Sequence, residues 1–168
     1  MSTTILVFSD SHGTSWNMQK VIKGYSGRYD NVFFLGDGLR DAESLVIPSD
    51  KGKVFVRGNC DFYSNEPALA MIDIDGYRFL LSHGHLYGVK SGLDPFAAAA
   101  REYDADAALF GHTHVPYEDC LTDGKKPLYL FNPGSISCPV YGKPTFGVIT
   151  VTGQGLLFSH GDPRDFAI

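Results

Sequence analysis

The sequence predicts an α/β protein in which two β-sheets pack together and helices cover the outside. In the first half of the chain, buried strands alternate with a helix. In the second half, short strands are separated by turn residues. The 168 residues are 43% hydrophobic and 20% charged, which is typical of a globular domain. This length suits one domain, which we expect to span residues 1–168.

The first half of the chain predicts parallel strands joined by a helix. Residues 4–9, 31–35 and 53–56 are short apolar runs rich in β-branched and aromatic side chains, typical of buried strands. Residues 15–23 mix polar and apolar side chains as a surface helix does, and Gly24 ends that segment. Because a strand, helix, strand order usually joins parallel neighbours, this half indicates a parallel sheet.

The second half predicts mostly antiparallel strands. Residues 68–73 and 77–82 flank an Asp-Gly turn signal, which favours a hairpin. Residues 95–103 are rich in alanine and predict a helix, with Asp94 as its N-cap. Further strands are expected at residues 105–110, 115–121, 127–131, 145–150 and 155–160, between turns rich in Gly, Pro, Asn and Asp.

Composition and charge exclude several classes of protein. No apolar run approaches the roughly 18 residues of a membrane-spanning helix. The first basic residue is Lys20, so no basic segment of a secretory signal is expected. The net charge of −5 argues against general nucleic-acid binding. Cys60, Cys120 and Cys138 lie far apart, which argues against a disulfide framework or a thiolate zinc site. We therefore expect a cytoplasmic protein without a membrane partner.

Side chains that can bind metal follow five of the predicted strands. Ligands in open α/β sheets lie beyond the carboxyl ends of the strands, so these side chains are expected to meet. One strand-end histidine or aspartate is usually structural, but five of the six histidines fall in these segments, which favours a shared site. The motifs are Asp-Ser-His at 10–12, Gly-Asp at 36–37, Gly-Asn-Cys-Asp at 58–61, His-Gly-His at 83–85 and Gly-His-Thr-His at 111–114.

This ordered set of motifs resembles the calcineurin-like metallophosphoesterase superfamily. The five blocks occur in the order of the family and span residues 10–114. The Asn-Pro-Gly-Ser sequence at 132–135 and the short chain further resemble the small YfcE-like phosphodiesterases of bacteria and archaea. The resemblance implies a four-layer αββα fold and a metal-dependent phosphodiesterase.

The resemblance also implies two divalent metal ions per chain. Their carboxylate, amide and imidazole ligands suit Mn²⁺, Ni²⁺, Fe²⁺ or Zn²⁺, of which we expect Mn²⁺ first. The implied reaction is direct attack on the phosphodiester by a hydroxide that bridges the two ions. By position, the resemblance assigns Asp10, His12, Asp37 and His114 to the first ion and Asp37, Asn59, His83 and His112 to the second, with Asp37 bridging.

Four residues are expected near the substrate: Asn59 and His83 beside the phosphate, together with Cys60 and His85. His85 either contacts the substrate or supports the ligands and their loop from behind. Cys60 stands where many superfamily members have a histidine that protonates the leaving oxygen or binds the phosphate. A thiol is a poorer proton donor at neutral pH than imidazolium, so diesters with acidic leaving groups are expected rather than alkyl monoesters. Asp61 is expected to orient ligand side chains rather than to bind metal.

Two other functions compete with the phosphodiesterase. One is a phosphomonoesterase or protein phosphatase of the same superfamily. The other is a non-catalytic scaffold, like the retromer cargo-recognition subunit, which has a similar fold and a degraded metal site. All seven ligand positions hold competent side chains here, which favours an enzyme acting on a small phosphodiester. A homodimer or tetramer is compatible with the sequence. Aromatic residues near the motif loops, which either stack on a substrate or belong to the core or an interface, are Phe62, Tyr63, Tyr87, Tyr117 and Tyr141.

Overall fold

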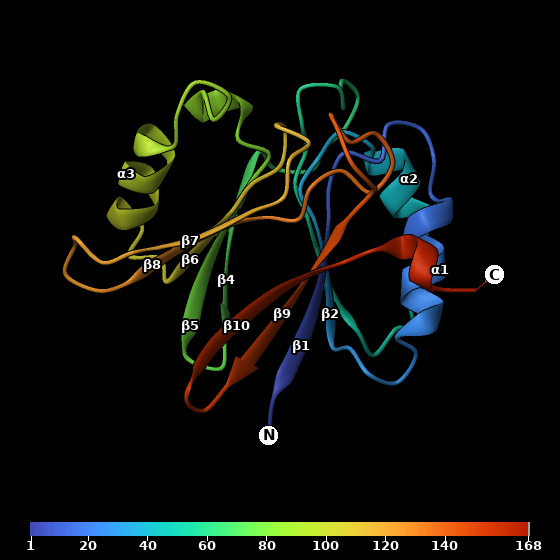
Figure 1. The fold of residues 1–168 in the computed structure, drawn as a ribbon, viewed down its shortest axis with the longest axis horizontal. Helices are drawn as coiled ribbons and strands as arrows, with labels where there is room; N and C mark the ends of the chain where they lie inside the picture. The colour runs from blue at the N-terminus through green and yellow to red at the C-terminus, as the bar shows by residue number, and fades with distance from the viewer. Residues whose placement is uncertain (168) are drawn as a thin grey trace.

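The computed structural model describes residues 1–167, and Ile168, the last residue of the expected domain, lies outside them. Two mixed β-sheets of five strands each are flanked by helices (Figure 1). The apolar side chains between the sheets come from both of them, including Ile5 and Val7 from the first and Phe79 and Leu81 from the second. The predicted two-sheet α/β architecture is therefore confirmed.

The first sheet has the strand order β10-β9-β1-β2-β3. Its three N-terminal strands are parallel, as predicted, and the C-terminal hairpin of β9 and β10 adds to β1 in the antiparallel direction. The strands are β1 (Thr3–Phe8), β2 (Asn31–Phe34), β3 (Gly52–Phe55), β9 (Phe146–Thr152) and β10 (Gly155–Gly161).

The second sheet has the order β4-β5-β6-β8-β7. The prediction that this half is mostly antiparallel was wrong at its centre, where β5, β6 and β8 are parallel. The helix between β5 and β6 makes the crossover that parallel neighbours need. Only the edge strands β4 and β7 are antiparallel to their neighbours. The strands are β4 (Leu69–Ile74), β5 (Tyr77–Ser82), β6 (Ala107–Leu109), β7 (Tyr117–Leu121) and β8 (Leu128–Asn132).

The position of strand β1 in the sheet explains why its sequence is apolar without interruption. Successive side chains of a strand point to opposite faces, and both faces of β1 are covered. Ile5 and Val7 pack between the sheets, whereas Leu6 and Phe8 pack beneath helix α1 (Trp16–Gly24). Every one of these four side chains is fully buried. Burial on both faces, rather than alternation with polar residues, marks a central strand in this fold.

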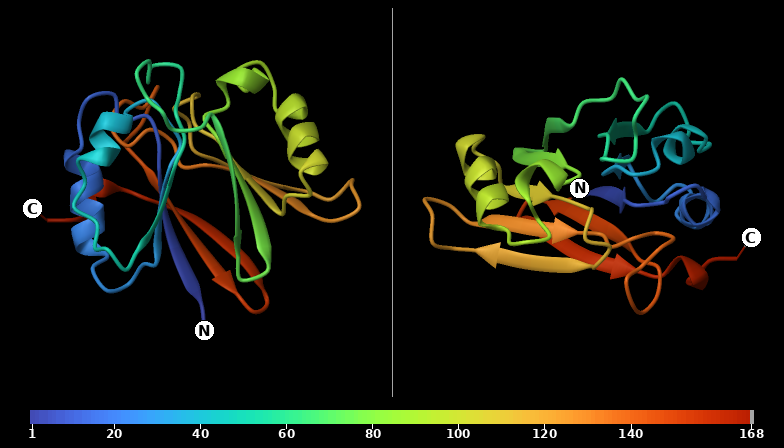
Figure 2. Two further views of the ribbon diagram at one scale, coloured as in Figure 1. Left: turned by 180° about the vertical axis from the view of Figure 1, so that it is seen from behind. Right: turned by 90° about the horizontal axis from the view of Figure 1, so that it is seen from above.

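The helices form the two outer layers. Helix α1 buries Met18, Val21 and Ile22 against the first sheet, and α3 (Asp94–Glu102) buries Phe96, Ala97 and Ala100 against the second. The view from behind places α1 and α2 (Leu39–Glu43) on one side and α3 on the other (Figure 2). None of the helices within residues 1–167 is long and apolar enough to cross a membrane.

The sequence prediction missed one helix and misplaced one cap. Helix α2 (Leu39–Glu43) has only five residues, too few for a periodic pattern to stand out. Helix α3 begins at Asp94 itself, with Leu93 in the capping position and no side-chain cap. Single 3-10 turns occur at His85–Tyr87 and Pro163–Asp165.

Candidate metal centre

Five loops meet at one end of the two sheets, where β1, β2, β3, β5 and β6 end (top of Figure 1). Backbone hydrogen bonds tie them together. Asp10 N donates to Gly36 O at 2.9 Å, and Gly111 N donates to His83 O at 3.0 Å. The structure therefore brings the strand-end motifs together at this end of the sheets.

The backbone of five predicted ligands is left-handed. Their φ angles lie between 46° and 71°, a region that few L-residues adopt, although Asp and His do so more often than most. Such a conformation costs on the order of 1–3 kcal/mol per residue and persists at sites where the surroundings enforce it. The fold thus accepts strain to direct these side chains inward. The five residues are Asp10, His12, Asp37, His112 and His114.

The first ligand cluster consists of Asp10, His12 and His114. Asp10 Oδ1 lies 3.1 Å from His114 Nε2 and 3.5 Å from His12 Nε2. Asp10 Oδ2 is held by other groups, since it accepts from Ser9 Oγ at 2.6 Å and from His112 N at 3.1 Å. Oδ1 is buried and has no hydrogen-bond partner among the described residues. The carboxylate is therefore fixed by one oxygen and presents the other to the cluster.

The second ligand cluster consists of Asp37, His83 and His112. His83 Nε2 lies 3.2 Å from both Asp37 Oδ2 and His112 Nδ1. Asp37 Oδ1 accepts a hydrogen bond from Cys60 N at 2.8 Å. Asp37 Oδ2 also lies 3.8 Å from His12 Nε2, which belongs to the first cluster. Asp37 therefore stands between the two groups.

Backbone carbonyls set the orientation of two histidines. His83 Nδ1 lies 2.7 Å from Leu35 O, and His114 Nδ1 lies 2.7 Å from Cys138 O. A carbonyl oxygen only accepts, so Nδ1 must carry the proton in both rings. In the neutral imidazole this leaves the lone pair on Nε2, the atom that faces the cluster. Both rings are thus prepared as ligands.

The pKa values of these groups follow from burial and close pairing. Burial alone would raise the pKa of Asp10, but the His114 and His12 rings close to its carboxylate hold this pKa well below its ordinary value. Burial likewise opposes ionisation of Asp37, and the neighbouring His83 outweighs it, so the pKa of Asp37 is lowered. Burial and the charge of His83 lower the pKa of His112 to about 4. At neutral pH the site therefore offers two carboxylates and a neutral imidazole of His112.

These donors fit divalent metal ions. Within each cluster the ligand atoms lie within 4.8 Å of one another. His12 Nε2 and His114 Nε2 face each other at 3.1 Å, and two lone pairs at that distance repel unless a cation or a proton lies between them. Carboxylate oxygens and imidazole nitrogens are the donor set that Mn²⁺, Fe²⁺, Ni²⁺ and Zn²⁺ accept.

The remaining predicted site residues lie at the rim of the clusters. Asn59 is exposed, and its Nδ2 atom lies 3.5 Å from Cys60 Sγ. Cys60 Sγ lies within 4.8 Å of ligand atoms of His12 and Asp37, and burial together with the charge of Asp37 raises the pKa of this thiol. The His85 ring lies 5.5 Å from the His83 ring, and its Nδ1 is buried without a partner among residues 1–167. Their roles toward metal and substrate stay predictions.

Asp61 organises the loop that presents Asp37. Its two carboxylate oxygens accept four backbone hydrogen bonds of 2.7–3.0 Å. The donors are the N–H groups of Asp37, Gly38, Leu39 and Gly58. The carboxylate thus joins the loop after β2 to the loop after β3, in agreement with an orienting role.

We expect Asp61→Asn to lower the free energy of unfolding by about 2 kcal/mol, because an amide NH₂ replaces one acceptor of charge-assisted hydrogen bonds. Metal affinity should fall about tenfold as the Asp37 loop loosens. Urea unfolding and metal titration measure the two effects. Asp123→Asn is the control, since Asp123 is an exposed carboxylate paired only with Arg101 in the described chain. Equal losses in both variants would contradict this role.

Two further groups support the clusters, and one of them, Asp41, was missed at the sequence level. Asp41, on α2, accepts from Ser11 Oγ at 2.6 Å and from Gly13 N at 2.8 Å, and so braces the loop that carries His12. Ser135 Oγ donates to Asp10 O at 2.8 Å and accepts from Cys138 N at 2.6 Å. The apolar pair three residues apart at Leu39 and Ala42 was the available signal for α2.

Comparison with known proteins identifies the family. The model of the calcineurin-like phosphoesterase superfamily domain matches residues 3–154. The chain belongs to this superfamily. Members of the calcineurin-like phosphoesterase superfamily are metal-dependent, in agreement with the two clusters of Asp and His side chains.

Similar proteins occur in bacteria and in eukaryotes. The probable metallophosphoesterase YsnB of Bacillus subtilis is 30% identical over 88% of this chain and 83% of its own. Phosphodiesterase YfcE of Escherichia coli is 30% identical over 86% of each chain. The crystal structure of a predicted phosphoesterase from Streptococcus pneumoniae has a TM-score of 0.78 and 29% identity, over 100% of this chain and 93% of its own.

A likeness of fold extends to solved structures of Vps29. The crystal structure of a Vps29 single mutant from Entamoeba histolytica has a TM-score of 0.67 with 21% identity, and covers 95% of this chain and 99% of its own. The fold predicted from the motifs is thereby confirmed as that of the metallophosphoesterases.

Proposed function

We propose that this protein is a phosphodiesterase that uses two divalent metal ions, with Mn²⁺ as the first candidate. One observation carries the proposal. Asp37 Oδ2 lies 3.2 Å from His83 Nε2 in one cluster and 3.8 Å from His12 Nε2 in the other. A carboxylate placed between two ligand sets can bridge two ions, as phosphoesterase chemistry with paired metals requires. The likeness to a protein named phosphodiesterase YfcE supports a diester substrate.

Different residues of the site would hold the two ions and the substrate. We assign Asp10, His12, Asp37 and His114 to one ion, and Asp37, Asn59, His83 and His112 to the other. When bound, two such ions neutralise charge on phosphoryl oxygens and lower the pKa of water. Their four positive charges exceed the two negative charges of the aspartates, so the site attracts a phosphate although the whole chain carries −5. His83 and Asn59 would border the phosphate, and His85 would contact the substrate from the rim.

The test is hydrolysis by metal-stripped protein with single ions added back. Bis(p-nitrophenyl) phosphate and p-nitrophenyl phosphate share a leaving group and differ in whether the phosphate is a diester. We expect activity to return with Mn²⁺ and to favour the diester by at least about tenfold. Inductively coupled plasma analysis gives the number of ions bound in the same samples. A preference for the monoester would identify a phosphomonoesterase instead.

A scaffold is the second candidate, and the fold likeness to Vps29 is the observation that favours it. Six side chains gathered into two ligand clusters favour hydrolysis instead. Protein that binds two ions yet hydrolyses neither ester would support the scaffold. The two candidates therefore differ in the same experiment.

We expect Cys60→His to extend activity toward esters of basic alcohols. An imidazolium donates a proton to a departing alkoxide better than a thiol does, a contribution of about 10²-fold for general acid catalysis. Methyl p-nitrophenyl phosphate and dimethyl phosphate separate acidic from basic leaving groups. Cys60→Ser is the matched control, since serine supplies no such donor. If the histidine and serine variants hydrolyse both esters in the wild-type ratio, position 60 does not select the leaving group.

A further inference from the structure

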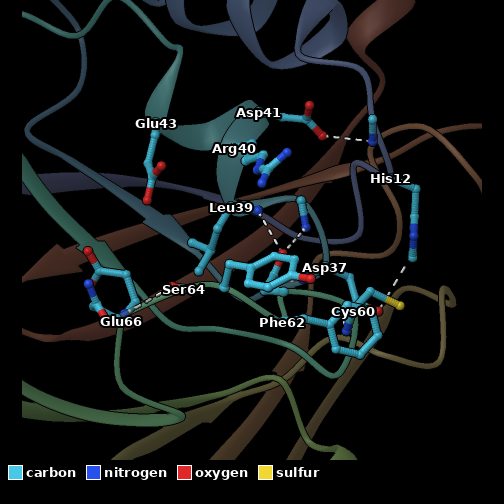
Figure 3. A pocket seen from close by; sticks show the side chains of 15 residues that line it. His12, Asp37, Leu39, Arg40, Asp41, Glu43, Cys60, Phe62, Ser64 and Glu66 are labelled. Carbon is cyan, nitrogen blue, oxygen red and sulfur yellow. Dashed lines mark hydrogen bonds and ion pairs between the residues drawn. The ribbon is translucent and has the colours of Figure 1, made fainter.

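A cavity of about 840 Å³ opens beside the metal centre, between helix α2 and the loop at residues 58–66 (Figure 3). Its wall includes His12 and Asp37, so the cavity and the ligand clusters are continuous. The volume lies in the range of pockets for small molecules. A group esterified to a phosphate at the metal centre can therefore extend into this cavity.

Two aromatic side chains of the loop line the cavity and remain open to solvent. Phe62 is 82% exposed and Tyr63 is 89% exposed. Neither contributes to the buried core of the two sheets. Neighbouring aromatic side chains left exposed at a cavity are typical of a binding surface, and their rings stack on planar groups. A flat ring on the substrate is the ligand that matches them.

The charge of the wall favours a neutral ligand. Asp61 and Asp41 line the cavity, but their carboxylates already accept hydrogen bonds from backbone N–H groups and a serine hydroxyl. Glu43 and Glu66 line the cavity as well, and Arg40 is the single Lys or Arg among its lining residues. Carboxylates accept hydrogen bonds from hydroxyl groups and repel a second phosphate.

We propose that this cavity binds one esterifying group of the diester and that this group is an uncharged nucleoside. The base would stack on Phe62 and Tyr63, and hydroxyl or amino groups of the nucleoside would donate to Glu43 and Glu66. A nucleoside that carries an additional phosphate is disfavoured. The inference rests on the proposed function, because it assumes that a phosphodiester occupies the metal centre.

Equilibrium binding tests the aromatic part. Thymidine 5′-(methyl phosphate) and dimethyl phosphate present the same charge at the metal centre and both have poor leaving groups. Calorimetric titration of the metal-loaded protein should show roughly tenfold tighter binding of the thymidine ester, the size of effect that stacking of one base supplies. Phe62→Ala and Tyr63→Ala should each remove most of this preference. Tyr103→Ala is the control. Tyr103 is an exposed aromatic residue at the C-terminal end of α3 and is not among the lining residues of the cavity.

A second ligand tests the charge of the wall. The same thymidine ester with a 3′-phosphate should bind the wild type roughly fivefold more weakly, because Glu43 and Glu66 repel it. Glu43→Gln combined with Glu66→Gln should abolish this difference. Both side chains lie at the surface of the pocket, so the variants are expected to fold.

The inference is wrong if the thymidine ester binds no tighter than dimethyl phosphate, or if Tyr103→Ala matches Phe62→Ala. It is also wrong if the 3′-phosphate strengthens binding. Failure of the proposed function gives a different result. In that case metal-loaded protein would leave methyl p-nitrophenyl phosphate intact, while the differences in binding between the thymidine ligands and their response to the variants would remain.

Discussion

Replacing Asp37 by asparagine is expected to reduce metal-dependent hydrolysis by at least about 10³-fold, because one carboxylate serves both ligand clusters. Asp37 Oδ2 lies between His83 Nε2 and His12 Nε2, and Oδ1 is fixed by Cys60 N. An amide keeps the shape and can still accept from Cys60 N, but it lacks the negative charge with which Asp37 would bridge the two proposed cations. The loss should therefore fall on metal binding and turnover, not on the fold.

Metal content and thermal stability separate these effects. A ligand that binds only the folded state stabilises it by about 2.7 kcal/mol at one hundred times its dissociation constant. Adding Mn²⁺ should raise the melting temperature of the wild type. The melting temperature of Asp37→Asn should rise much less, and this variant should bind fewer ions per chain. Asp162→Asn is the control, since Asp162 is also a buried carboxylate but pairs with Arg164 away from the five loops. Unchanged metal content in Asp37→Asn would contradict the assignment of Asp37 as a bridging ligand.

Strands β1 and β2, which carry the first two motifs, were predictable because each is buried on both faces. Strand β1 ends two residues before Asp10, and strand β2 ends two residues before Gly36. A change from continuous apolar residues to Gly, Asp and His is visible in the sequence itself. The convergence of the motifs then follows from the common direction of parallel strands.

Other features depend on contacts between distant residues and leave no local pattern. The parallel neighbours of β6 are set by packing of α3 across β5 and β6, not by the three residues of the strand. The orientation of His83 and His114 depends on the carbonyl oxygens of Leu35 and Cys138, and any residue has such an oxygen. The bracing of the His12 loop by Asp41 requires a helix too short to predict.

A substitution at Gly36 can also test how closely the loops of the metal centre pack against one another. Gly36 has φ +104°, and a Cβ atom there would lie 2.6 Å from Gly58 N and 2.8 Å from His83 Nδ1. The first neighbour is backbone and the second is the ring nitrogen that Leu35 O holds, so neither can move freely. Alanine at this position meets both a strained backbone conformation and two clashes.

We expect Gly36→Ala to lower the free energy of unfolding by about 2–5 kcal/mol, from strain at positive φ together with overpacking. It should also abolish metal binding, since the clash displaces His83 and the loop that supports Asp37. Gly76→Ala is the matched control. Gly76 has φ +87° in the β4–β5 turn, and nothing lies within 4 Å of its added Cβ, so it reports the cost of the conformation alone, about 1 kcal/mol. If the two variants lose equal stability and Gly36→Ala still binds metal, the loops are not packed as closely around His83 as the geometry requires.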